Sequence, residues 1–98
     1  MTPEGKVKKE IKDFLDTVPE LWYFMPVSLG MGRHGIPDII GCYKGHFFAV
    51  ECKAPGKSTT ALQLRELQAI DVAHGVGIVT DSVSTVQALI ALLNERHT

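Results

Sequence analysis

The sequence predicts one α/β domain in which helices pack on a mixed β-sheet, in the order α-β-β-β-α-β-α. A chain of 98 residues suffices for one small domain, which we expect to span residues 1–98. Apolar residues recur at helical spacing near both ends and in the second half of the chain. Two short apolar runs are joined by Lys44 and Gly45, a spacing typical of a β-hairpin.

The first half of the chain is predicted to hold one helix and three strands. Thr2 can cap the helix, Pro3 suits its first position, and Pro19 ends it. Pro26 indicates that the first strand lies at an edge of the sheet. The strands are predicted at residues 21–27, 38–43 and 46–53, with a glycine-rich loop at 28–37.

The second half predicts a helix, a strand and a final helix. Thr60 can cap a helix that runs to about His74, and Gly75 is a suitable stop. Its predicted core face consists of Leu64, Leu67, Ile70 and Ala73. A short strand is expected at Val76–Thr80. The last helix starts at Asp81 or Ser82, and its predicted inward residues are Val86, Leu89, Ile90 and Leu93.

Composition narrows the classes of function. The formal net charge is −1, so the chain does not coat nucleic acid through bulk positive charge, and DNA contacts must rest on local basic groups or metal ions. Cys42 and Cys52 show neither metal-ligand spacing nor a disulfide framework. With no apolar run long enough for a membrane span and no signal-peptide pattern, a reduced cytoplasmic protein is expected.

The hairpin makes a geometric prediction about charged residues. If Lys44 and Gly45 form its turn, Asp38 faces Glu51 across the two strands, and Lys53 points to the same side. Two adjacent carboxylates repel unless a positive group lies between them, and Mg²⁺ is a cation that prefers such oxygen ligands. The alternative is an exposed cluster of surface salt bridges.

The residues around these carboxylates resemble a known family. Pro37-Asp38, twelve intervening residues and Glu51-Cys52-Lys53 resemble the PD-(D/E)xK nuclease signature. The longer stretch GIPDIIGCYKGHFFAVECKAPGKSTTALQ is similar to its VRR-NUC branch, and the likeness runs from about Glu4 to Val79. The resemblance implies a restriction-endonuclease-like α-β-β-β-α-β core, here with an additional C-terminal helix. It also implies metal-dependent, structure-selective DNA cleavage.

The resemblance assigns roles to individual residues. Asp38 and Glu51 would bind Mg²⁺ or Mn²⁺, the backbone carbonyl of Cys52 would be a third ligand, and Lys53 would be the catalytic lysine. Gln63 matches a family glutamine on the following helix. From the residues alone, Thr60 and Gln63 also form a capping box, and the two roles are compatible.

The family also uses a glutamate of the first helix, for which Glu4 and Glu10 are candidates. Glu4 lies closer to the centre of the apolar stripe, so it is favoured as a catalytic residue that reaches the metal directly or through water. The alternative for Glu4 is an acid that favourably faces the helix dipole.

Several polar residues are candidates for DNA contacts. Four of them flank the predicted site: Arg33, Lys57, Ser58 and Thr60. Each of these residues also has a simpler explanation. Arg33 would lie in a solvated loop, and Lys57, Ser58 and Thr60 would belong to an ordinary helix cap. The first helix is also basic, through Lys6, Lys8, Lys9 and Lys12, which are either a DNA-facing patch or a solvated face.

The predicted function is therefore a Holliday-junction-resolvase-like endonuclease, encoded by a phage or prophage and acting in the bacterial cytoplasm. The alternatives are a nickase or flap nuclease, a catalytically inactive DNA-binding module, and an unrelated α/β domain. Cutting both strands of a symmetric junction needs two sites related by a two-fold axis, which predicts a homodimer. Its surface would be either Val83–Leu93 or Leu21–Pro26.

Overall fold

The computed structural model describes residues 1–27 and 32–97, and within them it has the predicted order of elements. Part of the predicted loop, residues 28–31, lies outside the described residues. The elements are α1 (Pro3–Leu15), β1 (Leu21–Phe24), β2 (Ile39–Tyr43), β3 (His46–Cys52), α2 (Ala61–Val72), β4 (Val76–Thr80) and α3 (Val83–His97). The β1 strand is thus shorter than predicted, and most other boundaries differ from the prediction by one or two residues.

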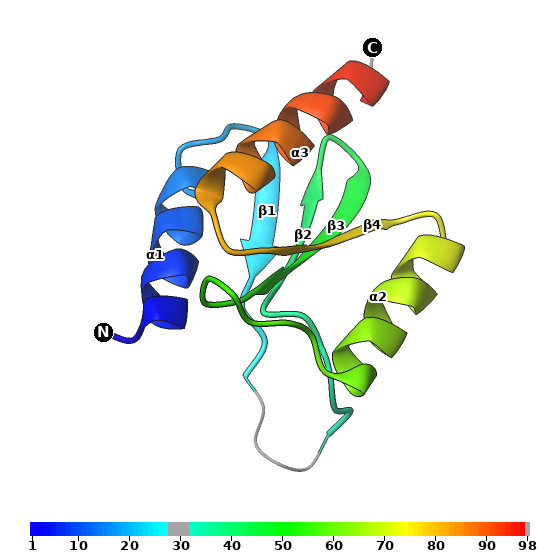
Figure 1. The fold of residues 1–98 in the computed structure, drawn as a ribbon. Coiled ribbons are helices and arrows are strands. Elements are labelled where there is room, and N and C mark those ends of the chain that lie inside the picture. The colour runs from blue at the N-terminus through cyan, green and yellow to red at the C-terminus, as the bar shows by residue number, and fades with distance from the viewer. Residues whose placement is uncertain (28–31, 98) are drawn as a thin grey trace.

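The four strands form one sheet in the order β1-β2-β3-β4 (Figure 1). The first three strands are antiparallel, and β4 is parallel to β3. A parallel pair needs a long crossover, and α2 provides it. The strand β1 lies at an edge of the sheet, as Pro26 predicted.

The turn between β2 and β3 fixes the register of the hairpin. Lys44 and Gly45 have φ angles of 48° and 86°, and two positive φ angles are typical of the type I′ turn that suits a two-residue hairpin loop. Tyr43 pairs with His46, and the ladder continues to Ile39 and Val50. The predicted register is therefore confirmed, and the next two residues along the ladder are Asp38 and Glu51.

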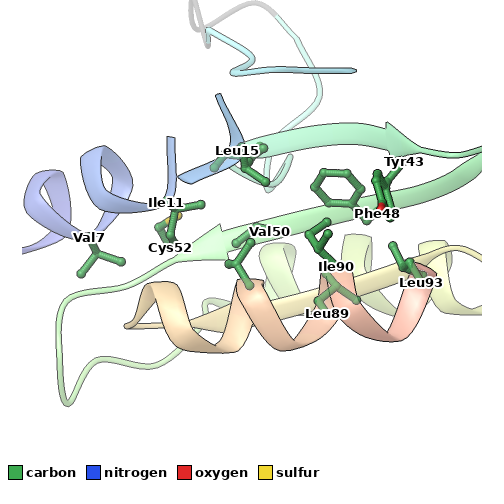
Figure 2. Packing of buried hydrophobic residues seen from close by; sticks show 12 residues of the cluster. Val7, Ile11, Leu15, Tyr43, Phe48, Val50, Cys52, Leu89, Ile90 and Leu93 are labelled. Atoms are coloured by element: carbon green, nitrogen blue, oxygen red, sulfur yellow. The ribbon is translucent and has the colours of Figure 1, made fainter. Parts of the chain in front are cut away.

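The hydrophobic core lies between the sheet and the helices α1 and α3. Figure 2 shows side chains from both helices and from β2 and β3 pointing toward one another. Phe48 is completely buried, and Gly41 on the neighbouring strand makes room for its ring, since a Cβ at Gly41 would lie 2.6 Å from it. Burial of each large apolar side chain contributes about 1.5–3 kcal/mol. Among the described residues, the fully or largely buried members are Val7, Ile11, Leu15, Ile39, Tyr43, Phe48, Val50, Cys52, Val86, Leu89, Ile90 and Leu93.

The two cysteines are separate thiols. Cys42 is half-buried, Cys52 belongs to the core, and both are free thiols. Burial raises the pKa of the Cys52 thiol to about 12, so the sulfur stays protonated and unreactive.

The predicted core face of α2 is partly wrong. Leu67 is buried and Ile70 half-buried, but Leu64 and Ala73 are exposed. The helix packs mainly against β4, where Gly77 gives space to the Leu67 side chain, rather than across the whole sheet. It therefore covers a narrower stripe than its apolar pattern suggested. No helix among residues 1–27 and 32–97 has the length and apolarity that crossing a membrane requires.

Candidate active site

Two carboxylates meet where β2 begins and β3 ends. Asp38 lies directly before β2, and its Oδ2 accepts a hydrogen bond of 2.7 Å from the backbone N–H of Cys52. This bond fixes the orientation of the Asp38 carboxylate. The side chains of Asp38 and Glu51 are hydrogen-bonded to each other, as expected for residues that face each other on adjacent strands.

Burial and proximity shift the two carboxyl groups in opposite directions. Burial raises the pKa of Glu51 to about 8, and the hydrogen bond and negative charge of Asp38 add to this effect. Burial also acts to raise the pKa of Asp38. The hydrogen bonds from Glu51 and Cys52, together with the positive charge of Lys8, outweigh burial and lower it below its usual value. Burial and the negative charge of Asp38 therefore favour the protonated form of Glu51, whereas Asp38 favours its charged form.

The first helix brings a third carboxylate and a cation to this site. The Nζ atom of Lys8 lies 3.3 Å from Asp38 Oδ1 and 3.3 Å from Glu4 Oε2. Burial acts to lower the pKa of Lys8, but the two carboxylates outweigh it and raise the pKa, so the ammonium group stays charged. Glu4 thus lies beside the site, whereas the other candidate, Glu10, is exposed on α1.

Two further lysines line a small polar hollow beyond the end of β3. Lys53 is half-buried and follows Glu51 by two residues, and its positive charge acts to lower the pKa of Glu51. The hollow has a volume of about 270 Å³ and is lined by Lys53, Lys57, Val79, Thr80, Asp81 and Thr85. Two lysines at a polar hollow beside two carboxylates offer positive charge to a phosphate group.

The start of α2 is closed by a complete capping box. Gln63 Oε1 accepts a hydrogen bond of 2.9 Å from the N–H of Thr60, and Thr60 Oγ1 accepts one of 3.2 Å from the N–H of Gln63. The capping role of both residues is therefore confirmed. Because the cap engages the Oε1 atom of Gln63, the amide NH₂ group of this side chain is the part that can contact a substrate. Ser58, just before the cap, is exposed.

The loop before Asp38 is attached to α2 by two contacts. The guanidinium group of Arg33 pairs with both carboxylate oxygens of Glu66, which is only 4% exposed. Gly35 packs on the first turn of the helix, where a Cβ would lie 2.5 Å from the backbone carbonyl of Leu62. Arg33 is thus engaged in an ion pair that the sequence did not predict, and its contact with DNA stays a prediction.

A larger hollow lies elsewhere on the described surface. Its volume is about 580 Å³, and it lies between α2 and the exposed parts of β2 and β3, with Ile40, Phe47 and Ile70 on its walls. The only carboxylate that lines it is Glu66, which Arg33 neutralises. This hollow therefore holds no pair of neighbouring carboxylates, and the candidate site stays at Asp38 and Glu51.

The donor set at Asp38 and Glu51 fits a divalent cation. Glu51 is 2% exposed, and its Oε2 atom has no hydrogen-bond partner, an arrangement that is costly unless something positive binds there. Within residues 1–27 and 32–97, no group of three or more His, Cys, Asp or Glu side chains is arranged to hold a metal. Two carboxylates with waters and backbone oxygen suit Mg²⁺, which usually binds through one or two carboxylates.

Sequence reasoning missed Lys8 as a member of the site. It treated Lys8 as one of four equivalent lysines of a basic helix, although Lys8 lies one helical turn after Glu4 and so shares its face. That spacing was the available signal. For Glu66 the sequence held no comparable signal, because its partner Arg33 lies in a loop 33 positions away.

Comparisons with known proteins bear on the fold and on the family that the sequence resembles. No protein-family model matches the chain. A solved structure described as "VRR_NUC domain" superposes with a TM-score of 0.77 at 26% identity, and the match covers 93% of this chain and 97% of that one. A 36-residue stretch is 50% identical to "Putative nuclease p44" of Acyrthosiphon pisum secondary endosymbiont phage 1. This match covers 36% of this chain and only 39% of that phage protein.

The likeness in structure extends over nearly the full length of both chains, and the order of helices and strands is the one that the resemblance implied. The mixed sheet with helices on its faces agrees with the α/β fold expected from the sequence. The chain thus has the fold of a solved VRR-NUC domain, the branch of the PD-(D/E)xK nucleases that its sequence resembles.

Proposed function

We propose that this chain is a metal-dependent DNA endonuclease that hydrolyses phosphodiester bonds. The observation that carries the proposal is the pairing of Asp38 with Glu51, whose buried Oε2 has no hydrogen-bond partner, beside Lys53. Such a pair is costly for a protein that merely needs a soluble surface. Its similarity to a VRR-NUC domain and to a phage nuclease supports the same activity.

Asp38 and Glu51 would hold Mg²⁺ or Mn²⁺, with the Cys52 carbonyl as a further ligand and Glu4 acting through water. A divalent cation in such a site polarises the phosphodiester and makes its bound water more acidic. The Cys52 N–H keeps Asp38 Oδ1 directed into the site by holding Oδ2. Lys53 would neutralise the charge that develops on the phosphate.

The groups around these residues would position the DNA backbone. Lys57 shares the polar hollow with Lys53 and would contact the next phosphate along the strand. Ser58 and Thr60 lie at the N-terminus of α2, where the helix dipole favours anions. The amide NH₂ of Gln63 would donate to a phosphate or to the attacking water. Arg33 would reach the backbone with the part of its guanidinium group that Glu66 does not occupy.

The substrate that we propose is branched DNA, cut in the manner of a Holliday-junction resolvase. This class of substrate is the one that the resemblance of the sequence to the VRR-NUC branch implies. The first experiment is cleavage of labelled four-way junction, flap, nicked and linear duplex DNA in Mg²⁺ and in Mn²⁺. We expect symmetric paired cuts in the junction, and no cutting in EDTA.

Each of the other outcomes would indicate a different activity or contradict part of the proposal. Preferential cutting of the flap or of one strand would identify a flap nuclease or a nickase. Binding of the junction without cutting in any divalent metal would identify an inactive DNA-binding module. Cleavage that persists in EDTA would contradict the proposed metal dependence.

We further propose that the protein acts as a homodimer through β1. Two surfaces are predicted from the sequence. In Val83–Leu93 the apolar face packs into the core of the same chain, where Val86 and Leu89 are buried. On β1, by contrast, Trp22 is 61% and Phe24 is 45% exposed, and their rings lie 5.5 Å apart. Adjacent exposed aromatic side chains are typical of interaction surfaces, and Leu21–Pro26 therefore suits a second copy better.

Trp22→Glu is expected to convert the dimer to a monomer, because it places a charge at the centre of the apolar surface on β1. Light scattering coupled to gel filtration measures this directly, since one chain has a mass of 10.7 kDa. The matched control is Leu92→Glu, which alters an exposed apolar residue of α3 and should leave the dimer intact. Dissociation by Leu92→Glu alone would transfer the interface to α3, and a monomeric native protein would contradict the resolvase proposal.

A further inference from the structure

Lys8 occupies the position from which a cation would contact the free oxygen of Asp38. The two oxygens of Asp38 have different partners: Oδ2 accepts from the Cys52 N–H at 2.7 Å, and Oδ1 faces Lys8 Nζ at 3.3 Å. The donor of the bond to Oδ2 is the backbone of Cys52, the last residue of β3, whose position is fixed by the sheet. Oδ1 is therefore the Asp38 oxygen that the hydrogen bond from Cys52 leaves available to a cation.

The same ammonium group also neutralises Glu4. Lys8 Nζ lies 3.3 Å from Glu4 Oε2, so that one positive charge lies between two carboxylates from different elements. The Lys8 side chain is only 32% exposed, and it is the residue of α1 that reaches Asp38. Two cations beside one carboxylate repel each other strongly when water is partly excluded.

We propose that Lys8 competes with the divalent cation for Asp38 and thereby sets the metal affinity of the site. This rests on the proposed metal dependence of the nuclease. Binding of the metal requires the ammonium group to withdraw from Asp38 Oδ1 and to keep Glu4 as its partner. At low metal concentration, Lys8 neutralises the carboxylates of Glu4 and Asp38. Because the metal has to displace this ammonium group from Asp38, Lys8 weakens metal binding.

The test is isothermal titration of the whole protein with Mn²⁺ alone, without DNA. Lys8→Met is expected to bind Mn²⁺ roughly tenfold more tightly than the native protein, within the range typical of coupled sites. Lys8→Arg keeps the charge and should restore the native affinity. The matched control is Lys9→Met, which removes the same charge from the same helix but only frees Asp13, its exposed partner at 2.6 Å.

An unchanged or weaker Mn²⁺ affinity in Lys8→Met would overturn the proposal. An equal gain in Lys9→Met would also overturn it, because the effect would then be one of net charge. A rise in the KM for DNA at unchanged Mn²⁺ affinity would mean that Lys8 contacts phosphate instead. Absence of Mn²⁺ binding in both the native protein and Lys8→Met would overturn it as well.

Cleavage assays separate this proposal from the proposed function. If Lys8→Met binds Mn²⁺ more tightly but neither protein cuts any DNA, competition at Asp38 stands and the nuclease proposal fails. If both proteins cut DNA, the Mn²⁺ concentration for half-maximal cleavage should fall in Lys8→Met. A structural role alone would not move that midpoint.

Discussion

Asp38→Asn is expected to lower the rate of DNA cleavage at least about a thousandfold at saturating Mg²⁺. A bound metal contributes several kcal/mol of transition-state stabilisation, and each 1.36 kcal/mol corresponds to about a factor of ten. The substitution removes the negative charge of Oδ1, which no neighbouring carboxylate replaces, since Glu51 is held on the facing strand. It also leaves Lys8 opposite a neutral amide.

The substitution is suited to this test because the fold should tolerate it. An asparagine carbonyl oxygen can still accept the hydrogen bond from the Cys52 N–H that Asp38 Oδ2 accepts. Loss of cleavage can therefore be attributed to chemistry once circular dichroism and thermal unfolding match those of the native protein.

The measurement is a single-turnover cleavage assay on whichever DNA the native protein cuts. Asp13→Asn is the matched control, because Asp13 is an exposed carboxylate of α1 whose partner is Lys9. We expect the control to cut at the native rate. A rate within about tenfold of native in Asp38→Asn would exclude Asp38 as an essential metal ligand. It would also contradict the assignment of the active site to this position.

The site could be predicted from the sequence to the extent that it depends on local geometry. A two-residue turn at Lys44-Gly45 fixes every later pair of the hairpin, and a strand has a side-chain period of two. The approach of Asp38 to Glu51 follows from these two facts alone. The cap of α2 is equally local, because Thr60 and Gln63 are three residues apart.

The rest depends on how separate elements pack, which residue spacing does not determine. The reach of Lys8 to Asp38 depends on the rotation and position of α1 over the sheet. The pairing of Arg33 with Glu66 joins a loop to a helix across 33 positions. Leu64 has the spacing of a core residue, yet a helical pattern cannot tell whether its stripe meets a sheet or solvent at each turn.

The second large effect concerns the pH dependence of stability in the presence of EDTA. In the native state, burial and the neighbouring Asp38 raise the pKa of Glu51 from 4.5 to about 8. Between these two pH values the folded protein binds a proton at Glu51 that the unfolded chain has released. By linkage, the free energy of unfolding must then fall as pH rises from about 5 to about 8.

The expected loss is on the order of 2–4 kcal/mol, which lowers the melting temperature of a domain of this size by roughly 10–20 °C. Asp38 acts in the opposite direction, but its lowered pKa confines that effect to pH values below its ordinary 3.8. Calorimetry at several pH values measures the slope. Glu10→Gln, which removes an exposed carboxylate of α1, should keep the native slope.

Glu51→Gln is expected to abolish this slope between pH 5 and 8, because a neutral amide resembles the protonated carboxyl and does not titrate. The variant should therefore be more stable than the native protein at pH 8 and close to it at pH 5. Equal slopes in the two proteins would mean that Glu51 titrates like an exposed carboxyl. If the slope is lost in Glu51→Gln, the difference between the two proteins measures the free energy needed to bury the charged form of Glu51 beside Asp38. A divalent cation bound between the two carboxylates would offset that free energy.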